Sequence, residues 1–303
     1  MYSLRRFLTA LLLVCPALNV AALAADCAPV PDTVADRLAH YVHDSFGFSR
    51  LTVIKLADTQ LVGADCYRKA TFVRLEGGKP YAKINLYLSP NQQFLSHDLM
   101  DTTLTVAEYK TTTQRILEKS LTDGVFPTIG SNQADITLTI FSDFQCPYCR
   151  QEAAILREWL RTNKTRIRVL FRNLPLTGHR WARAAAEIAA CVHAQDNDAF
   201  WKLHDAIFSH QDEITSETLS STVDRILTGT PGIDLEDLHK CAADHLTASL
   251  VDRDVDFAMS HGIEATPTIF IDGYRHDGVI LAEQMETLIR EVISRENGAQ
   301  VKH

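Results

Sequence analysis

Apolar side chains in the first third of the chain follow two spacings, one helical and one extended. Residues 32–46 repeat apolar positions every three or four residues, and Gly47 signals the end of that helix. The apolar runs that follow favour strands, and Gly77-Gly78 is typical of a hairpin turn between two of them. The expected strands cover Leu51–Leu56, Ala70–Leu75, Tyr81–Leu88 and a weaker piece at Phe94–Leu95. This order predicts a small α+β domain over residues 27–103.

The rest of the chain alternates strands with helices and contains one long helical stretch. Tyr109–Lys119 has helical spacing and leads to the turn-rich Thr122–Asn132, so residues 104–130 are expected to form a helical linker. The expected elements beyond the linker are a strand Ile136–Phe141, a helix Cys146–Arg161, a strand Ile167–Phe171, helices at Trp181–Ala194, Ala199–Phe208, Glu217–Leu227, Leu235–Ala243 and Ala248–His261, a strand Thr268–Ile271, a turn at Asp272-Gly273 with a short strand, and a helix Leu281–Ser294. This order predicts an α/β, thioredoxin-like fold over residues 131–296, with a helical insertion at 179–262.

The first 24 residues have the order of a secretory signal peptide. Arg5 and Arg6 precede an apolar run over residues 7–14, and small residues follow. A membrane anchor is the competing interpretation, but the run is well short of the ~20 residues that span a bilayer. A lipoprotein signal fits poorly because Asp26 stands before Cys27, where a small residue is expected. We expect a cleaved signal over residues 1–24 and a periplasmic location.

Composition and charge narrow the classes of function. The chain is 46% hydrophobic and 22% charged, with no low-complexity tract, as in globular proteins. Its formal charge of −8 would become −10 once the two arginines of the signal are removed. We expect no nucleic-acid partner, because phosphate binding needs concentrated Lys and Arg. Cleavage would leave six of the seven cysteines, and an even number in an exported protein indicates disulfides.

The motif Cys146-Pro147-Tyr148-Cys149 stands where a strand has ended and a helix begins. Disulfide exchange needs one thiolate that attacks and a second thiol that releases the mixed disulfide. The first cysteine would lie at the helix N-terminus, where unpaired N–H groups and the helix dipole stabilise a thiolate and lower its pKa. Proline suits the first helical position because it has no N–H to lose there. The motif predicts Cys146 as the nucleophile and Cys149 as the resolving thiol, with no cofactor beyond this redox-active disulfide.

Two other interpretations of the motif are weaker. A C-x-x-C pair can be half of a zinc site, but such sites want a second pair or a His pair at short spacing, and the sequence offers neither. We therefore expect no metal. A structural disulfide of this size would be strained and easily reduced, which suits a redox site better than a permanent bridge.

Four segments resemble the DsbA-like family of thioredoxin-fold thiol–disulfide oxidoreductases, over roughly residues 130–294. They are Phe141–Cys149, Phe171–Leu176, Arg183–Glu187 and Ala265–Gly273. The resemblance implies that Pro267 is a cis-proline facing the two cysteines and that Thr266 presents its backbone to a substrate peptide. Taken alone, Thr266-Pro267 would be an ordinary proline at the start of a strand, since cis bonds are only about 5–6% of X–Pro bonds in folded proteins.

The same resemblance implies a disulfide between Cys191 and Cys241, a pair that is bridged in many relatives. Both residues lie on predicted helices of the insertion, and two buried free thiols are the alternative. A bridge would stabilise the fold by roughly 3–4 kcal/mol by restricting the unfolded chain. Cys27 and Cys66 then remain in the N-terminal domain, and we expect them to pair.

The group that takes the proton from Cys149 is left open. Some relatives bury an acidic residue beneath the cysteines, but the strand before the motif has none. Asp143 is the nearest carboxylate and is expected to be a helix cap or a surface charge rather than a buried base. The other candidates are expected to be core or surface residues, although some of the aromatic ones could line a peptide groove: His179, His204, His261, Trp181, Trp201 and Phe208.

The N-terminal domain adds a resemblance in arrangement to DsbC and DsbG, in which a small domain that dimerises and a helical linker precede the catalytic domain. This arrangement favours an isomerase or reductase that acts on unfolded or misoxidised exported proteins, and it makes a homodimer an option. Isomerase or reductase activity is therefore the function expected from the sequence, and the DsbA-like segments make a disulfide oxidase the alternative. A periplasmic holdase or peptide-binding module is the non-enzymatic alternative. Either enzyme would need a redox partner protein, expected at the membrane.

Overall fold

The computed structural model of the chain describes residues 27–300, apart from 47, 49–51, 64, 77, 98, 100–102, 132 and 164–165. The expected signal peptide, Gly47 and Gly77 lie outside the described residues. Within the described part, no helix combines the length and the apolar character that crossing a bilayer requires.

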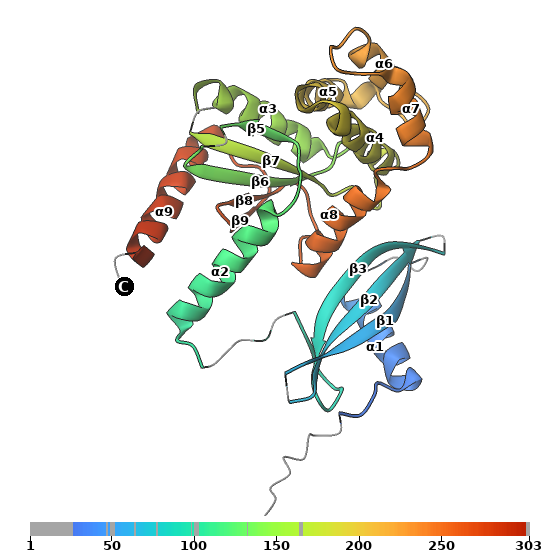
Figure 1. The fold of residues 1–303 in the computed structure, drawn as a ribbon, viewed down its shortest axis with the longest axis vertical. Coiled ribbons are helices and arrows are strands. Elements are labelled where there is room, and N and C mark those ends of the chain that lie inside the picture. Colours follow the sequence, from blue (N-terminus) through green and yellow to red (C-terminus); the bar gives the residue numbers. More distant parts are fainter. Residues whose placement is uncertain are drawn as a thin grey trace, which may run out of the picture.

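An N-terminal helix and a four-stranded antiparallel sheet form the first unit (Figure 1). Its elements are α1 (Asp32–Ser45), β1 (Val53–Val62), β2 (Tyr67–Glu76), β3 (Lys79–Leu88) and β4 (Leu95–Ser96), in the sheet order β1-β2-β3-β4. Leu38 and Val42 of α1 are buried in one cluster with Phe72 and Ile84, which pair across β2 and β3. The predicted small α+β region is therefore present. β1 runs past its predicted end at Leu56, because a bulge there lets its pairing with β2 continue.

The second unit is built on a mixed five-stranded sheet in the order β5-β7-β6-β8-β9. Its strands are β5 (Thr128–Gly130), β6 (Ile136–Ser142), β7 (Ile167–Asn173), β8 (Thr268–Ile271) and β9 (Tyr274–Asp277), with the helices α3 (Pro147–Asn163) and α9 (Ala282–Gln300). β6 and β7 are parallel and the other pairs antiparallel, so the predicted thioredoxin-like fold is confirmed. β5 lies where turns were expected. Gly130, with φ at +102°, permits its close approach to β7, because a Cβ there would overlap the carbonyl of Ile167.

Helices inserted between β7 and β8 form a layer over the second unit (Figure 1). They are α4 (Ala182–Gln195), α5 (Asn197–Ser209), a 3₁₀ turn Gln211–Glu213, α6 (Leu219–Leu227), α7 (Leu235–Ala243) and α8 (Ala248–Ser260). An aromatic cluster holds α5 to the motif segment and to β7, and its ring contacts join Phe144, Phe171, Phe200, Trp201, His204 and Phe208. Trp181 is buried in the same hydrophobic cluster. The expectation that these aromatic residues form the core of the insertion is confirmed.

The helix α2 (Val106–Thr122) connects the two sheets and lies beside the second one (Figure 1). It begins earlier than predicted because Thr105 and Glu108 form a capping box, in which each side chain accepts a hydrogen bond from the other residue's N–H. Gln114 donates a hydrogen bond of 3.1 Å to the carbonyl of Asp272, which follows β8. Leu121 near its end is fully buried. The connector is thus fixed to the second unit.

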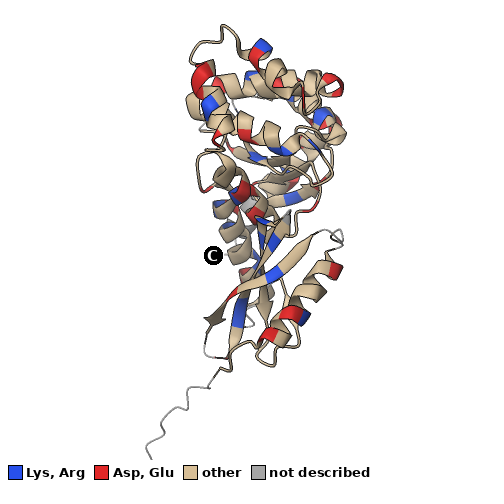
Figure 2. Cartoon of the chain, turned by 90° about the vertical axis from the view of Figure 1, so that its right-hand side faces the viewer, with Lys and Arg blue, Asp and Glu red and all other residues tan. Residues whose placement is uncertain are grey.

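The helix α8 joins the two units through its contact with β3. The backbone N–H of Lys83 donates to the carboxylate of Asp256, and Asn85 donates to the hydroxyl of Ser260 at 3.1 Å. Apolar residues of α8 belong to the same continuous hydrophobic cluster as α1 and the N-terminal sheet. In the side view of Figure 2, Lys and Arg lie along the strands of the N-terminal sheet, whereas the charged residues of α1 are mainly Asp. A core therefore crosses the predicted domain boundary at residue 103, and that boundary stays a prediction.

A buried ion pair lies between α8 and β7. Arg172 Nε donates to Asp254 Oδ1 at 2.9 Å, and the two side chains are only 2% and 5% exposed. Asp254 also accepts the backbone N–H of Asn173 at 2.9 Å. The guanidinium carbon lies 4.1 Å from the ring centroid of Phe257. Because both charges are removed from water, each depends on the other for its solvation.

Candidate active site

The two cysteines of the motif lie at the start of α3, which begins at Pro147 directly after Cys146. Both are free thiols here and both are buried, Cys146 at 4% and Cys149 at 1% exposure. Tyr148 between them is 63% exposed. The helix start therefore holds the two sulfurs together inside the protein while it presents an aromatic side chain to solvent.

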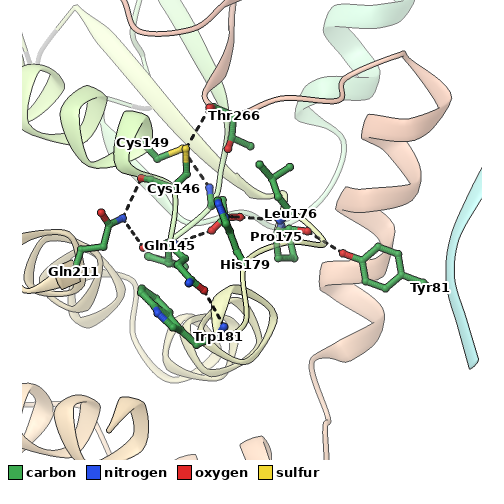
Figure 3. Close-up of polar contacts among 12 residues, drawn as sticks. Tyr81, Gln145, Cys146, Cys149, Pro175, Leu176, His179, Trp181, Gln211 and Thr266 are labelled. Atoms are coloured by element: carbon green, nitrogen blue, oxygen red, sulfur yellow. Dashed lines mark hydrogen bonds and ion pairs between the residues drawn. The ribbon is translucent and has the colours of Figure 1, made fainter. Parts of the chain in front are cut away.

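Cys146 faces the loop before β8 (Figure 3). Its thiol donates to the carbonyl of Thr266 with a sulfur–oxygen distance of 3.4 Å, and the Thr266–Pro267 peptide bond is cis. The pKa of Cys146 is lowered from 9.0 to about 5, chiefly by a hydrogen bond from Cys149, against the opposing effect of burial. The Thr266 side chain and the backbone N–H groups of Cys149 and Tyr148 lower it further. Cys146 is thus poised to be a thiolate near neutral pH.

The pKa of Cys149 is shifted in the opposite direction. Burial raises its pKa well above 9.0, and the neighbouring Cys146 raises it further. The backbone N–H of Asp143 donates to its sulfur at 3.4 Å and offsets part of this effect. One thiol of the pair therefore ionises readily while the other keeps its proton.

Asp143 is buried, with a fully enclosed side chain, and the expectation of a surface charge was wrong. One carboxylate oxygen accepts the N–H of Gln145 at 2.7 Å, in the turn that precedes α3. The other accepts the N–H of Leu176 and contacts Nδ1 of His179, both at 2.7 Å. Asp143 is buried because the loop after β7 covers its carboxylate and supplies hydrogen-bond partners to it. Asp143 therefore fixes that loop to the motif.

The helical insertion holds the motif from the other side (Figure 3). Gln211 donates from its amide to the carbonyls of Phe144 and Cys146, at 2.9 and 3.0 Å. The side-chain oxygen of Gln145 accepts the N–H of Trp181 at 2.8 Å. Neither glutamine was predicted as a site residue, since an amide in a polar segment has no sequence signal of its own. Together they fix the backbone that carries the nucleophile.

A buried carboxylate that the sequence analysis missed lies one helical turn after Cys149. Glu152 is 2% exposed and shares a cavity of about 10 Å³ with Cys149, Ser142 and His204. Its Oε2 accepts the N–H of Ile280 at 2.8 Å, while Oε1 has no hydrogen-bond partner within the described part of the chain. Burial raises the pKa of Glu152 to about 7. The i, i+3 spacing from Cys149 was the available signal, because such residues share a helix face. The carboxyl group of Glu152 and the thiol of Cys149 thus line the same small buried cavity.

The structure brings the other four cysteines together as two disulfides. Cys191 on α4 is bonded to Cys241 on α7, which lie 50 positions apart in the sequence. Cys27 is bonded to Cys66 at the turn between β1 and β2. Among the residues that the structure describes, no three His, Cys, Asp or Glu side chains converge as metal ligands.

An apolar surface borders the cysteines on the side of Tyr148. A pocket of about 360 Å³ is lined there by Tyr148 and Gln151 of α3, by the loop residues 265–267 and by residues 278–279 after β9. It lies next to the Thr266 carbonyl that contacts Cys146. A polypeptide laid along this loop would have its backbone beside the nucleophile.

Known proteins resemble the C-terminal unit. The sequence profile of the thioredoxin family matches residues 122–291. The Na(+)/H(+) antiporter NhaA 3 of Salinispora tropica is 35% identical over 161 residues, which are 53% of this chain and 24% of the antiporter, so the chain spans about a quarter of that protein's length. The disulfide bond formation protein D of Bacillus subtilis is 27% identical over 176 residues, 56% of this chain and 76% of that protein.

The fold has a counterpart among solved structures. The thiol-disulfide exchange protein alpha-DsbA2 of Wolbachia pipientis matches with a TM-score of 0.52 at 21% identity, over 62% of this chain and all of that protein. This likeness concerns the fold, and the family match covers more than half of the sequence. The chain therefore belongs to the thioredoxin family.

Proposed function

We propose that this chain forms disulfides in exported proteins, with Cys146 as the nucleophile and Cys149 as the resolving thiol. The observation that carries the proposal is the opposite behaviour of the two thiols, with the pKa of Cys146 lowered to about 5 and that of Cys149 raised. A thiolate that is stable in the reduced protein makes the disulfide form an oxidant, because its reduction is favoured.

The reaction balances as two thiol–disulfide exchanges. A client thiolate attacks the Cys146 sulfur of the oxidised pair, the Cys146–Cys149 bond breaks, and Cys149 leaves and takes up a proton. A second client thiolate then attacks the client sulfur of the mixed disulfide, and Cys146 leaves as a thiolate. The client loses two electrons and the pair gains them. Glu152 can supply the proton to Cys149 and recover it when the pair is reoxidised.

Isomerase or reductase activity is the second candidate, and the N-terminal unit with its connecting helix is the observation that favours it. The two candidates differ in the direction of electron flow. We expect the pair to be mostly oxidised in freshly isolated periplasm, by alkylation of free thiols before and after reduction. A mostly reduced pair would favour the isomerase or reductase instead.

The role of the cysteines is tested by trapping the client. In Cys149→Ala, the mixed disulfide cannot be resolved, so a reduced, unfolded client should accumulate as a covalent adduct that dithiothreitol releases. Cys146→Ala should give no adduct and no oxidation of the client. Two results together would replace the proposal with the holdase alternative. The wild type would not catalyse oxidation of the client, and Cys146→Ala would protect the client from aggregation as well as the wild type does.

We also propose export to the periplasm and reoxidation by a partner protein at the membrane, because each turnover leaves the pair reduced. A homodimer, which the domain arrangement suggests, is tested by gel filtration of the chain without residues 1–24. A monomer at micromolar concentration would rule out a dimer-based cleft.

A further inference from the structure

A second pocket lies between the N-terminal unit and the C-terminal unit. It has a volume of about 330 Å³, within the usual range of ligand pockets. Both units supply apolar residues to its walls, with Phe46 and Phe48 from the first unit, Leu176 from the loop after β7, and Met259 and Ile263 from the end of α8 and the turn after it. Polar side chains also line it, among them Arg74, whose guanidinium lies over the Phe48 ring, and Glu264. The rings of Phe46 and Phe48 are stacked at 5.7 Å.

Two loops connect the walls of this pocket to the active site. The N–H of Leu176 donates to Asp143, whose own N–H donates to the sulfur of Cys149. Tyr81 of β3 donates its hydroxyl to the carbonyl of Pro175 at 2.8 Å, so the N-terminal sheet is bonded to the same loop (Figure 3). On the other wall, the chain runs from Ile263 directly towards the loop that contacts Cys146.

We propose that this pocket receives an apolar side chain of the client polypeptide, close in sequence to the cysteine that reacts with Cys146. The N-terminal unit is then part of the client-binding site of its own chain. The inference rests on the proposed function, since it needs a client cysteine at Cys146. The inference predicts that the client segment is extended and carries a large apolar residue near the reactive cysteine.

The spacing of the loop residues supports an extended polypeptide as the occupant. Glu264 lines the pocket and Thr266 contacts Cys146, so the two features are separated by two residues. Two residues of extended chain span about 7 Å. Because the chain bends at residues 265–267, this distance is an upper limit for the loop, and an extended client segment covers it within two residues of its cysteine. The Tyr148 pocket borders the same loop at residues 265–267, so one strand can reach both.

The test compares Phe48→Ala in the full chain with the matched control Phe94→Ala. Phe94 belongs to the same unit, is 66% exposed and is not part of the pocket. The reactants are glutathione disulfide and two peptides with one cysteine activated as a glutathione mixed disulfide, which carry either Phe or Gly two positions to each side of the cysteine. The second-order rate constants are measured by stopped flow.

We expect the wild type and Phe94→Ala to react about tenfold faster with the Phe peptide than with the Gly peptide, as burial of part of an aromatic side chain would give. Phe48→Ala should lose this preference while its rates with the Gly peptide and glutathione disulfide stay unchanged. Equal preference in Phe48→Ala and Phe94→Ala would overturn the inference and leave the proposed function intact. Failure of the wild type to react with any of the three would overturn the proposed function itself.

Phe48→Leu covers the case in which Phe48→Ala does not fold. The smaller branched side chain keeps part of the apolar wall, so the preference for the Phe peptide should fall severalfold without a change in the glutathione rate. A preference equal to that of the wild type in a folded Phe48→Leu would contradict the inference. The inference would also be contradicted if the rate constants with the Phe peptide, the Gly peptide and glutathione disulfide all fell by the same factor. The substitution would then act on the cysteines and not on the pocket.

Discussion

Replacement of Cys149 by alanine should raise the pKa of Cys146. The fall of that pKa from 9.0 to about 5 corresponds to about 5.5 kcal/mol in favour of the thiolate. The hydrogen bond from Cys149 is its largest cause, and a hydrogen bond to a charged group contributes about 1.5–3 kcal/mol. Its loss therefore moves the pKa of Cys146 up to between about 6 and 7.

The assay is the thiolate absorbance at 240 nm as a function of pH, with Cys149→Ser as the matched control. Serine keeps a hydroxyl donor at the same position, so its effect on the pKa should be smaller than that of alanine. A pKa near 5 in Cys149→Ala would refute the reasoning, since Thr266 and the backbone N–H groups would then suffice. Equal shifts in the two variants would refute the role of a hydrogen bond.

The same lowered pKa predicts how the stability of the reduced protein depends on pH. Because the pKa of Cys146 is lower in the folded state than in the unfolded state, its contribution is complete above pH 9 and is lost as the pH falls to about 5. At pH 7 about 3 kcal/mol of it remains. The melting temperature of the reduced protein should therefore approach that of the oxidised protein as the pH is lowered from 7 to 5.

Other predictions concern buried groups and the insertion. Since folded Glu152 holds its proton up to about pH 7, the free energy of unfolding of the oxidised wild type, in which Cys146 does not titrate, should fall by about 3 kcal/mol between pH 4.5 and 7, and urea titrations of oxidised Glu152→Gln should not show this fall. Asp254→Asn leaves Arg172 buried without its counter-charge, and urea unfolding should show a loss of about 3–5 kcal/mol; a loss below 1 would contradict the buried-pair argument. Replacing both Cys191 and Cys241 by alanine opens a loop of 50 residues and should cost about 4 kcal/mol, measured by the same method, whereas a variant as stable as the wild type would show that the bridge does not restrict the unfolded chain.

The strands and the redox motif could be predicted because their signals are local. β6 and β7 are continuous apolar runs, and Pro147 fits a helix start whatever surrounds it. Glu152 could not be recognised in this way, since its burial depends on the segment around Ile280 packing against α3. Asp143 is enclosed by a loop more than thirty positions away, which no local pattern reports.

The docking of the N-terminal unit on α8 was also beyond the reach of the sequence pattern. The apolar positions of α8 predict a buried helix, but they fit the core of the insertion as well as a contact with a second sheet. The side chains of Asp256 and Ser260, which bond to β3, look like solvated positions in the sequence. Only the three-dimensional arrangement distinguishes the two environments.

The position of α8 between two cores limits how this chain can change in evolution. On one side the helix must keep Asp254 for Arg172, and on another it must keep Asp256 and Ser260 for β3. A descendant that lost β1–β3 would expose apolar surface on α8 and would need several simultaneous substitutions there. The N-terminal unit is therefore not a module that can be gained or shed by recombination alone, and α8 should record its presence in any lineage that carries it.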